Sequence, residues 1–161
     1  MSAVSEAVAS PTSRGFQTIF VAGFIAGVLD LTAACVYSWL RAGVSPVRVF
    51  HSVASGLLGA TAFTGGAMTA ALGIVLHFFI ATSWATVYYL ASRKLSFLVN
   101  QPIPAGLIYG VVVYLFMNFV VLPLSAVARR PVPISARIIG CLIIMFCIGL
   151  PIALIVRKFA R

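Results

Sequence analysis

Residues 17–40 read QTIFVAGFIAGVLDLTAACVYSWL, a stretch with a single charged side chain. An α-helix rises about 1.5 Å per residue, so this stretch is long enough to cross a hydrocarbon core of about 30 Å. Tyr37 and Trp39 stand near its end and Arg41 follows them, an order typical of a membrane interface. We therefore predict a transmembrane helix here.

Three further apolar stretches have the same character and cover about 67–90, 105–124 and 134–156. The whole chain is 62% hydrophobic and 8% charged, with a mean hydropathy of +1.14, far from the averages of soluble domains. The sequence predicts an all-α fold, a polytopic transmembrane helical bundle of four spans. Residues 1–15 are small and polar and are predicted to form a flexible tail before a single transmembrane domain over residues 16–161.

The stretch at 47–64 differs from the four spans. It reads VRVFHSVASGLLGATAFT, follows Pro46 and ends at two glycines. Phe50, Val53 and Leu57 recur at helical spacing, with serines and glycines on another face. These features predict a helix that is interfacial or re-entrant. A short fifth span is the alternative.

Basic residues dominate the charge of the chain, which is +9 with eleven Lys and Arg against two acids. No segment offers the long solvated basic face of a nucleic-acid-binding protein, so we expect no nucleic acid partner. A four-span topology puts both termini on one side, which the positive-inside rule only slightly favours as the cytoplasmic side. The opposite rim, where we expect anionic phospholipid headgroups as partners, then carries Arg41, Arg48, Arg129, Arg130 and Arg137.

Asp30 is the only acid in any predicted span and lies near the middle of the first. A charge at that depth costs at least about 2.5 to 3.5 kcal/mol on insertion scales. Its helical face carries small residues, including the Gly23 and Gly27 pair, so we expect the carboxyl group to point into the bundle. His77 is equally central and also lies on a small-residue face, which predicts that the two side chains pair. The alternative is a separate packing role for each of them.

Asn118 and Tyr114 lie on one face of the third span and extend this candidate intramembrane polar site. Catalytic templates are missing, since Ser55 lies in VASGLLG rather than in GxSxG and no HExxH motif or phosphate-binding loop occurs. Cys35, Cys141 and Cys147 have no CxxC spacing and are expected to be small core residues. We expect no catalytic residues, no metal site and no cofactors.

The runs ASGLLGATAFTGG, LGIVLHFFIAT and YGVVVYLFMNFVVLPLSA resemble a group of small uncharacterised bacterial inner-membrane proteins. The resemblance covers residues 30–126. It implies a compact helical bundle that crosses a cell membrane, the bacterial inner membrane, several times. It implies no catalytic residue, because the group has no established activity.

These observations lead to two functional hypotheses. The first is a non-enzymatic structural, lipid-associated or accessory membrane component that self-associates as a homo-oligomer, with the polar residues serving helix packing. The second is a small oligomeric transporter or channel subunit with an intramembrane proton or ligand site at Asp30 and His77. So small a bundle hardly encloses a pathway alone, so the second hypothesis requires an oligomer. An intramembrane enzyme ranks third, for want of a nucleophile or a metal set.

Overall fold

The computed structural model describes residues 11–128 and 132–160, and every regular element in these two ranges is a helix. Four helical segments within them are long and apolar enough to cross a membrane, as predicted. The first two segments are α1 (Pro11–Ala42) and α3 (Gly66–Ser92). The third consists of α5 (Pro102–Phe116), η2 (Met117–Val121) and α6 (Leu122–Leu124). The fourth consists of α7 (Ile134–Ile144), η3 (Met145–Gly149) and α8 (Leu150–Ala160). The chain thus has the organisation of a multi-pass membrane protein.

Helix α1 begins earlier than the sequence suggested. Residues 11–15, assigned to the polar tail, form its first turn, while residues 1–10 lie outside the described ranges. A proline is well accepted at the first position of a helix, because the N–H that it lacks would have no partner there. Pro11 therefore marks the beginning of the helix rather than a segment outside it.

The segment predicted to be interfacial or re-entrant consists of α2 (Pro46–Leu58) and the 3₁₀ turn η1 (Gly59–Phe63). Thirteen residues of α-helix reach only about 20 Å, which is too short for a span. One face of α2 is buried against α3, where the His51 Nε2–H donates to the carbonyl oxygen of Gly66 at 3.0 Å. The backbone has positive φ at Gly43, Gly59 and Gly66, so glycine makes possible each turn around this segment.

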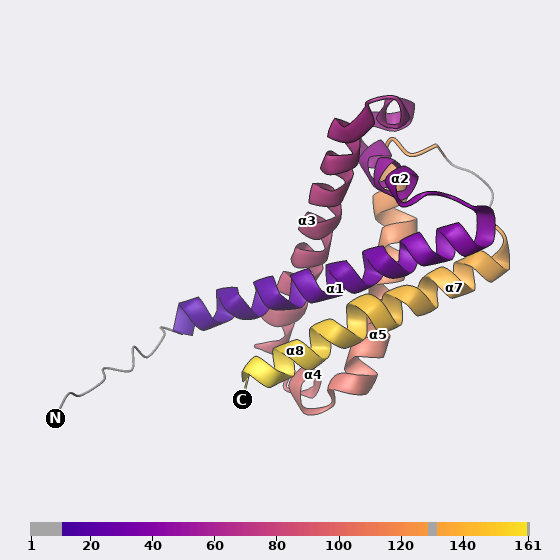
Figure 1. Ribbon diagram of the computed structural model, residues 1–161. Coiled ribbons are helices and arrows are strands. Elements are labelled where there is room, and N and C mark those ends of the chain that lie inside the picture. The colour runs from indigo at the N-terminus through magenta and orange to yellow at the C-terminus, as the bar shows by residue number, and fades with distance from the viewer. Residues whose placement is uncertain (1–10, 129–131, 161) are drawn as a thin grey trace.

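The described helices are arranged in two groups. Helix α1 packs on α3, which also carries α2, while α5 packs on η3 and α8. The α7–α8 segment runs beside α1 and joins the groups (Figure 1). The beginning of α1, the end of α3 and the end of α8 consequently lie at one end of the molecule, and the short helix α4 (Phe97–Asn100) connects α3 to α5 there.

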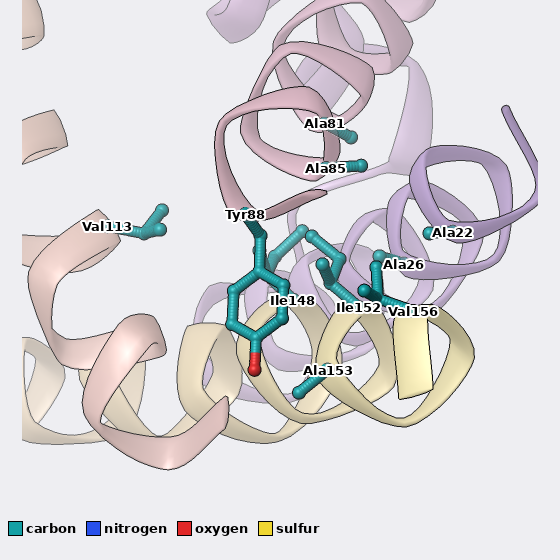
Figure 2. Packing of buried hydrophobic residues seen from close by; sticks show 10 residues of the cluster. All are labelled: Ala22, Ala26, Ala81, Ala85, Tyr88, Val113, Ile148, Ile152, Ala153 and Val156. Atoms are coloured by element: carbon teal, nitrogen blue, oxygen red, sulfur yellow. The ribbon is translucent and has the colours of Figure 1, made fainter. Parts of the chain in front are cut away.

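Small side chains fill the core between these helices. Figure 2 shows alanines of α1 and α3 facing isoleucine and valine side chains of η3 and α8, around the fully buried Tyr88. Lipid tails are as apolar as a protein core, so helices in a membrane associate through close packing rather than through the hydrophobic effect. Within the described part of the chain, the core residues are Ala22, Ala26, Ala81, Ala85, Tyr88, Val113, Ile148, Ile152, Ala153 and Val156.

Glycines bring helices into backbone contact at several points, among them the contacts of α1 with α3 and of α5 with η3. A Cβ atom on Gly23 would lie 2.6 Å from Thr82 Cα, so α1 touches α3 at this point. Gly106 and Gly110 of α5 likewise face Gly149 of η3. The first of these small-residue faces was predicted from the sequence and the second was not, although Gly106 and Gly110 have the GxxxG spacing of close helix contacts.

Candidate functional site

A cavity of about 300 Å³ lies between the two helix groups. Its wall draws on α1, α2, α3, α5, η2, α6, α7 and η3, and on the residues that follow α6. Most of the lining is apolar, and among the described residues Asp30 and His77 are its two ionisable side chains. The lining residues are Asp30, Ser52, Val53, Gly56, His77, Ile80, Ala81, Trp84, Val113, Met117, Val121, Leu122, Ser125, Val127, Ile144 and Ile148.

Asp30 and His77 meet in this wall. The His77 Nε2 atom lies 4.0 Å from Asp30 Oδ2, and both side chains are largely buried, with exposed fractions of 13% for His77 and 18% for Asp30. The small residues on α1 allow this approach, because they bring the backbone of α1 close to α3. The structure thus brings together the two side chains that the sequence singled out.

The Nε2 atom of His77 also lies 2.9 Å from the carbonyl oxygen of Gly27. A carbonyl oxygen only accepts, so Nε2 carries the proton of this hydrogen bond. His77 thus ties α3 to α1, and its ring is held at one position beside the carboxylate.

The carboxyl group of Asp30 has a different environment. Within the described ranges, its polar contact is the one with His77, and no hydrogen bond to another helix is present. The Cys147 thiol of η3 lies near enough to interact electrostatically with this carboxyl group. The acid therefore faces the cavity with acceptor capacity that the packing of the helices does not use.

Asn118 and Tyr114, the other members of the predicted polar site, do not join the pair. The Asn118 amide donates to the carbonyl oxygen of Tyr114 in its own helix at 2.9 Å, and neither residue lines the cavity. The Tyr114 ring faces α7 instead, where a Cβ atom on Gly140 would touch it at 3.6 Å. The position of Asn118 and Tyr114 on one face of the third span therefore did not predict which side chains they meet across the bundle.

Trp84 is a further residue of the cavity wall, and the sequence analysis did not select it as a site residue. It lines the cavity two turns after His77 on α3, and its ring meets the rings of Tyr109 and Phe116 edge to face. The Tyr109 hydroxyl donates to the carbonyl oxygen of Trp84 at 2.7 Å and so connects α5 to α3. The spacing of seven residues between His77 and Trp84 was the available signal, because it places both on one helix face.

Two π-helical turns of the described chain also border the cavity. The turns η2 and η3 each end two residues before a proline, Pro123 and Pro151 respectively. A proline inside a helix removes one hydrogen bond and its ring collides with the carbonyl of the preceding turn, so a wider turn relieves the collision. Met117 and Val121 of η2 and Ile148 of η3 line the cavity.

The predicted arginine rim is described in part, because Arg129 and Arg130 lie outside the described ranges. Arg41 lies near the end of α1, 5.9 Å from the Tyr37 ring centroid, while Arg48 lies 5.6 Å from that of Phe63. Arg137 is in the first turn of α7. The three described arginines are all exposed.

Within residues 11–128 and 132–160, no three His, Cys, Asp or Glu side chains gather into a set that would hold a metal ion. No family model, curated protein or solved structure matches this chain. The resemblance to small bacterial inner-membrane proteins therefore stays a prediction, and the functional proposal rests on the site itself.

Proposed function

We propose that this chain is a subunit of a small oligomeric transporter of a bacterial inner membrane, and that its cavity binds the transported molecule beside Asp30 and His77. One observation carries the proposal: the acid and the histidine, which are largely buried where α1 packs on α3, both line a cavity. Ionisable residues inside membrane segments commonly mark substrate or proton pathways.

The free-energy cost of placing Asp30 inside a membrane span supports a functional role for this residue. An acid in the middle of a span costs at least about 2.5 to 3.5 kcal/mol on insertion scales, whereas Asn or Ser would pack there at a smaller cost. The hydrogen bond that joins α1 to α3 at this point comes from His77 to Gly27, so Asp30 is not needed to make it. A purely structural site would retain the histidine and dispense with the acid.

The size and lining of the cavity support a small ligand. About 300 Å³ is at the lower end of the range for small-molecule sites, which is about 300 to 1,000 Å³. An apolar wall with a few polar groups is the usual composition of such sites. The alternation of access that transport requires would come from movement between the two helix groups, or between subunits of the oligomer.

A structural or lipid-associated accessory component is the second candidate function. The exposed Arg41 and Arg48 favour it, because such cations at a membrane rim attract anionic headgroups. This role does not account for the cavity or for its acid. The two functions differ in one respect that is easily measured, namely whether a molecule binds in the cavity.

Trp84 offers a direct test, since the only other tryptophan of the chain is Trp39. A Trp39→Phe protein in lipid nanodiscs is titrated with 4-(4-bromophenyl)butan-1-ol, whose bromine quenches Trp84 on contact. We expect saturable quenching that Gly56→Leu abolishes, because a Cβ at Gly56 has open space, its nearest neighbour being Ser125 at 4.0 Å, and the longer side chain fills the cavity.

The matched control is Ala71→Leu, which places a leucine at an exposed position of α3. It should leave the saturable quenching unchanged. Quenching that rises without saturation, or equally in the Gly56→Leu protein, reflects only partition of the probe into lipid and overturns the proposal.

A further inference from the structure

The charges of the cavity wall indicate which ligands it accepts. Among the described lining residues, Asp30 is the one acid, His77 is the one base, and none is Lys or Arg. This is unexpected in a chain with eleven Lys and Arg and two acids. A carboxylate or phosphate would enter without a fixed cation on these residues to receive it, whereas a cation would meet the carboxylate of Asp30.

The surroundings of Asp30 leave room for such a cation. The carboxylate faces the cavity, and within the described ranges its polar contact is His77 Nε2 at 4.0 Å, beyond the length of a good hydrogen bond. An ammonium group in the cavity would donate to a carboxylate oxygen at about 2.8 Å, a shorter and stronger contact.

The rest of the wall suits the other part of an amphipathic molecule. Trp84 presents an aromatic ring that attracts cations over its face and accommodates aromatic groups. Val113, Met117 and Ile148 add an apolar surface. A ligand with a single ring and a short chain matches both this lining and the cavity volume.

We infer that the cavity binds an amphipathic primary amine, and that its ammonium group takes the place of the proton that keeps the pair of Asp30 and His77 neutral. This inference rests on the proposed function and names its substrate class. Before binding, the pair holds one proton, which lies either on the imidazole of His77 or on the carboxyl group of Asp30 and makes the net charge of the pair zero. The arriving ammonium balances the carboxylate instead, so that proton leaves to water and the imidazole stays neutral.

The charged and titratable neighbours of the pair are few. Besides His77, the described titratable groups near Asp30 include the Cys147 thiol of η3. The described residues of α2 and α5 contribute no acid or base to the cavity wall. One proton released for each amine bound is therefore the expected stoichiometry. An exchange of this kind couples the movement of a cation to the movement of a proton in the opposite direction.

Three probes of similar size test the inference on the Trp39→Phe protein in nanodiscs. They are 4-(4-bromophenyl)butylamine, the matching alcohol and the matching carboxylic acid. We expect the amine to quench Trp84 with a Kd at least tenfold below that of the alcohol, and the carboxylate to bind more weakly than the alcohol. A pH indicator in weak buffer should record about one proton per bound amine and none for the alcohol.

Asp30→Asn separates the inference from the proposed function. It should remove the tenfold advantage of the amine and the proton release, so that the amine and the alcohol bind the variant with Kd values within a factor of about two of each other. Alcohol binding in the variant also demonstrates that the cavity is still folded. Asp30→Glu retains the charge and should recover part of the preference for the amine.

Equal affinity of the amine and the alcohol in the unmodified cavity overturns the inference and leaves the proposed function intact. The inference is also wrong if the Asp30→Asn protein keeps the preference, because the cation would then bind elsewhere. Absence of saturable binding by all three probes defeats both the inference and the proposed function.

Discussion

The contact between α5 and η3 supports a quantitative prediction about stability. A Cβ atom on Gly110 would lie 2.5 Å from Met145 Cα and 3.2 Å from the Ile144 carbonyl oxygen. Carbon atoms normally approach to about 3.5 to 4.0 Å, so Gly110→Ala requires α5 and η3 to separate by about 1 Å. Both neighbours are backbone atoms, so no change of rotamer relieves the collision.

Gly140→Ala is the matched control on α7. A Cβ atom there would meet only the Tyr114 ring at 3.6 Å, which is an ordinary contact. Alanine is favoured over glycine in a helix by about 1 kcal/mol, and this gain is common to both variants. Overpacking costs about 1 to 3 kcal/mol, so Gly110→Ala should have a free energy of unfolding lower than that of Gly140→Ala by this amount.

The assay is unfolding of the purified protein by SDS in mixed micelles, followed by tryptophan emission. We expect the transition of the Gly110→Ala protein at a lower SDS fraction than that of the original chain, and the Gly140→Ala transition at the same or a higher fraction. Coincident transitions for the two variants would refute the close approach of α5 and η3, and with it the conclusion that glycines set this helix pair.

Three other predictions concern the topology, the arginine rim and the link between α3 and α5. In a cysteine-free background, cysteines at Lys94 and Arg41 should react with an impermeant maleimide from opposite sides of the membrane, and labelling from the same side would contradict four spans. Native mass spectrometry should detect less retained phosphatidylglycerol after Arg41→Gln and Arg48→Gln than after the control Lys94→Gln, because headgroup attraction is about 1 kcal/mol per basic residue. Equal retention would contradict the binding of anionic headgroups by the arginine rim. Tyr109→Phe removes the hydrogen bond to the Trp84 carbonyl and should lower the free energy of unfolding by about 1 kcal/mol in the same SDS titration, and an unchanged transition would mean that this bond adds nothing.

The sequence by itself determined the class of fold. Hydrocarbon admits only backbones whose polar groups are satisfied internally, so stretches such as 17–40 and 67–90 have to be helices once they lie in a membrane. The length of each stretch then fixes the number of spans, and the shortness of α2 excludes a fifth among the described residues. These conclusions need only local information, since helical hydrogen bonds join residues close in the chain.

The pairing of Asp30 with His77 could also be predicted from the sequence, partly on energetic grounds. Two ionisable groups at the centre of small-residue faces have few ways to lower their cost, and meeting each other is one of them. The same reasoning failed for Asn118, because an amide satisfies itself on its own helix by donating to the Tyr114 carbonyl. A neutral polar group in a span therefore says little about its neighbours.

Only the tertiary structure decided where the cavity lies and what lines it. Trp84, Gly56 and Ser125 come from segments far apart in the chain, and their meeting depends on how α2 packs on α3 and how the π turns shift the third and fourth spans. A Cβ atom on Gly73 would collide with the backbone of Phe50, so a glycine at this position allows α2 to pack closely on α3, whereas the two π turns accompany Pro123 and Pro151. A pattern of apolar residues encodes which segments are helices, whereas the angles and distances between them depend on the shapes of all the facing surfaces at once.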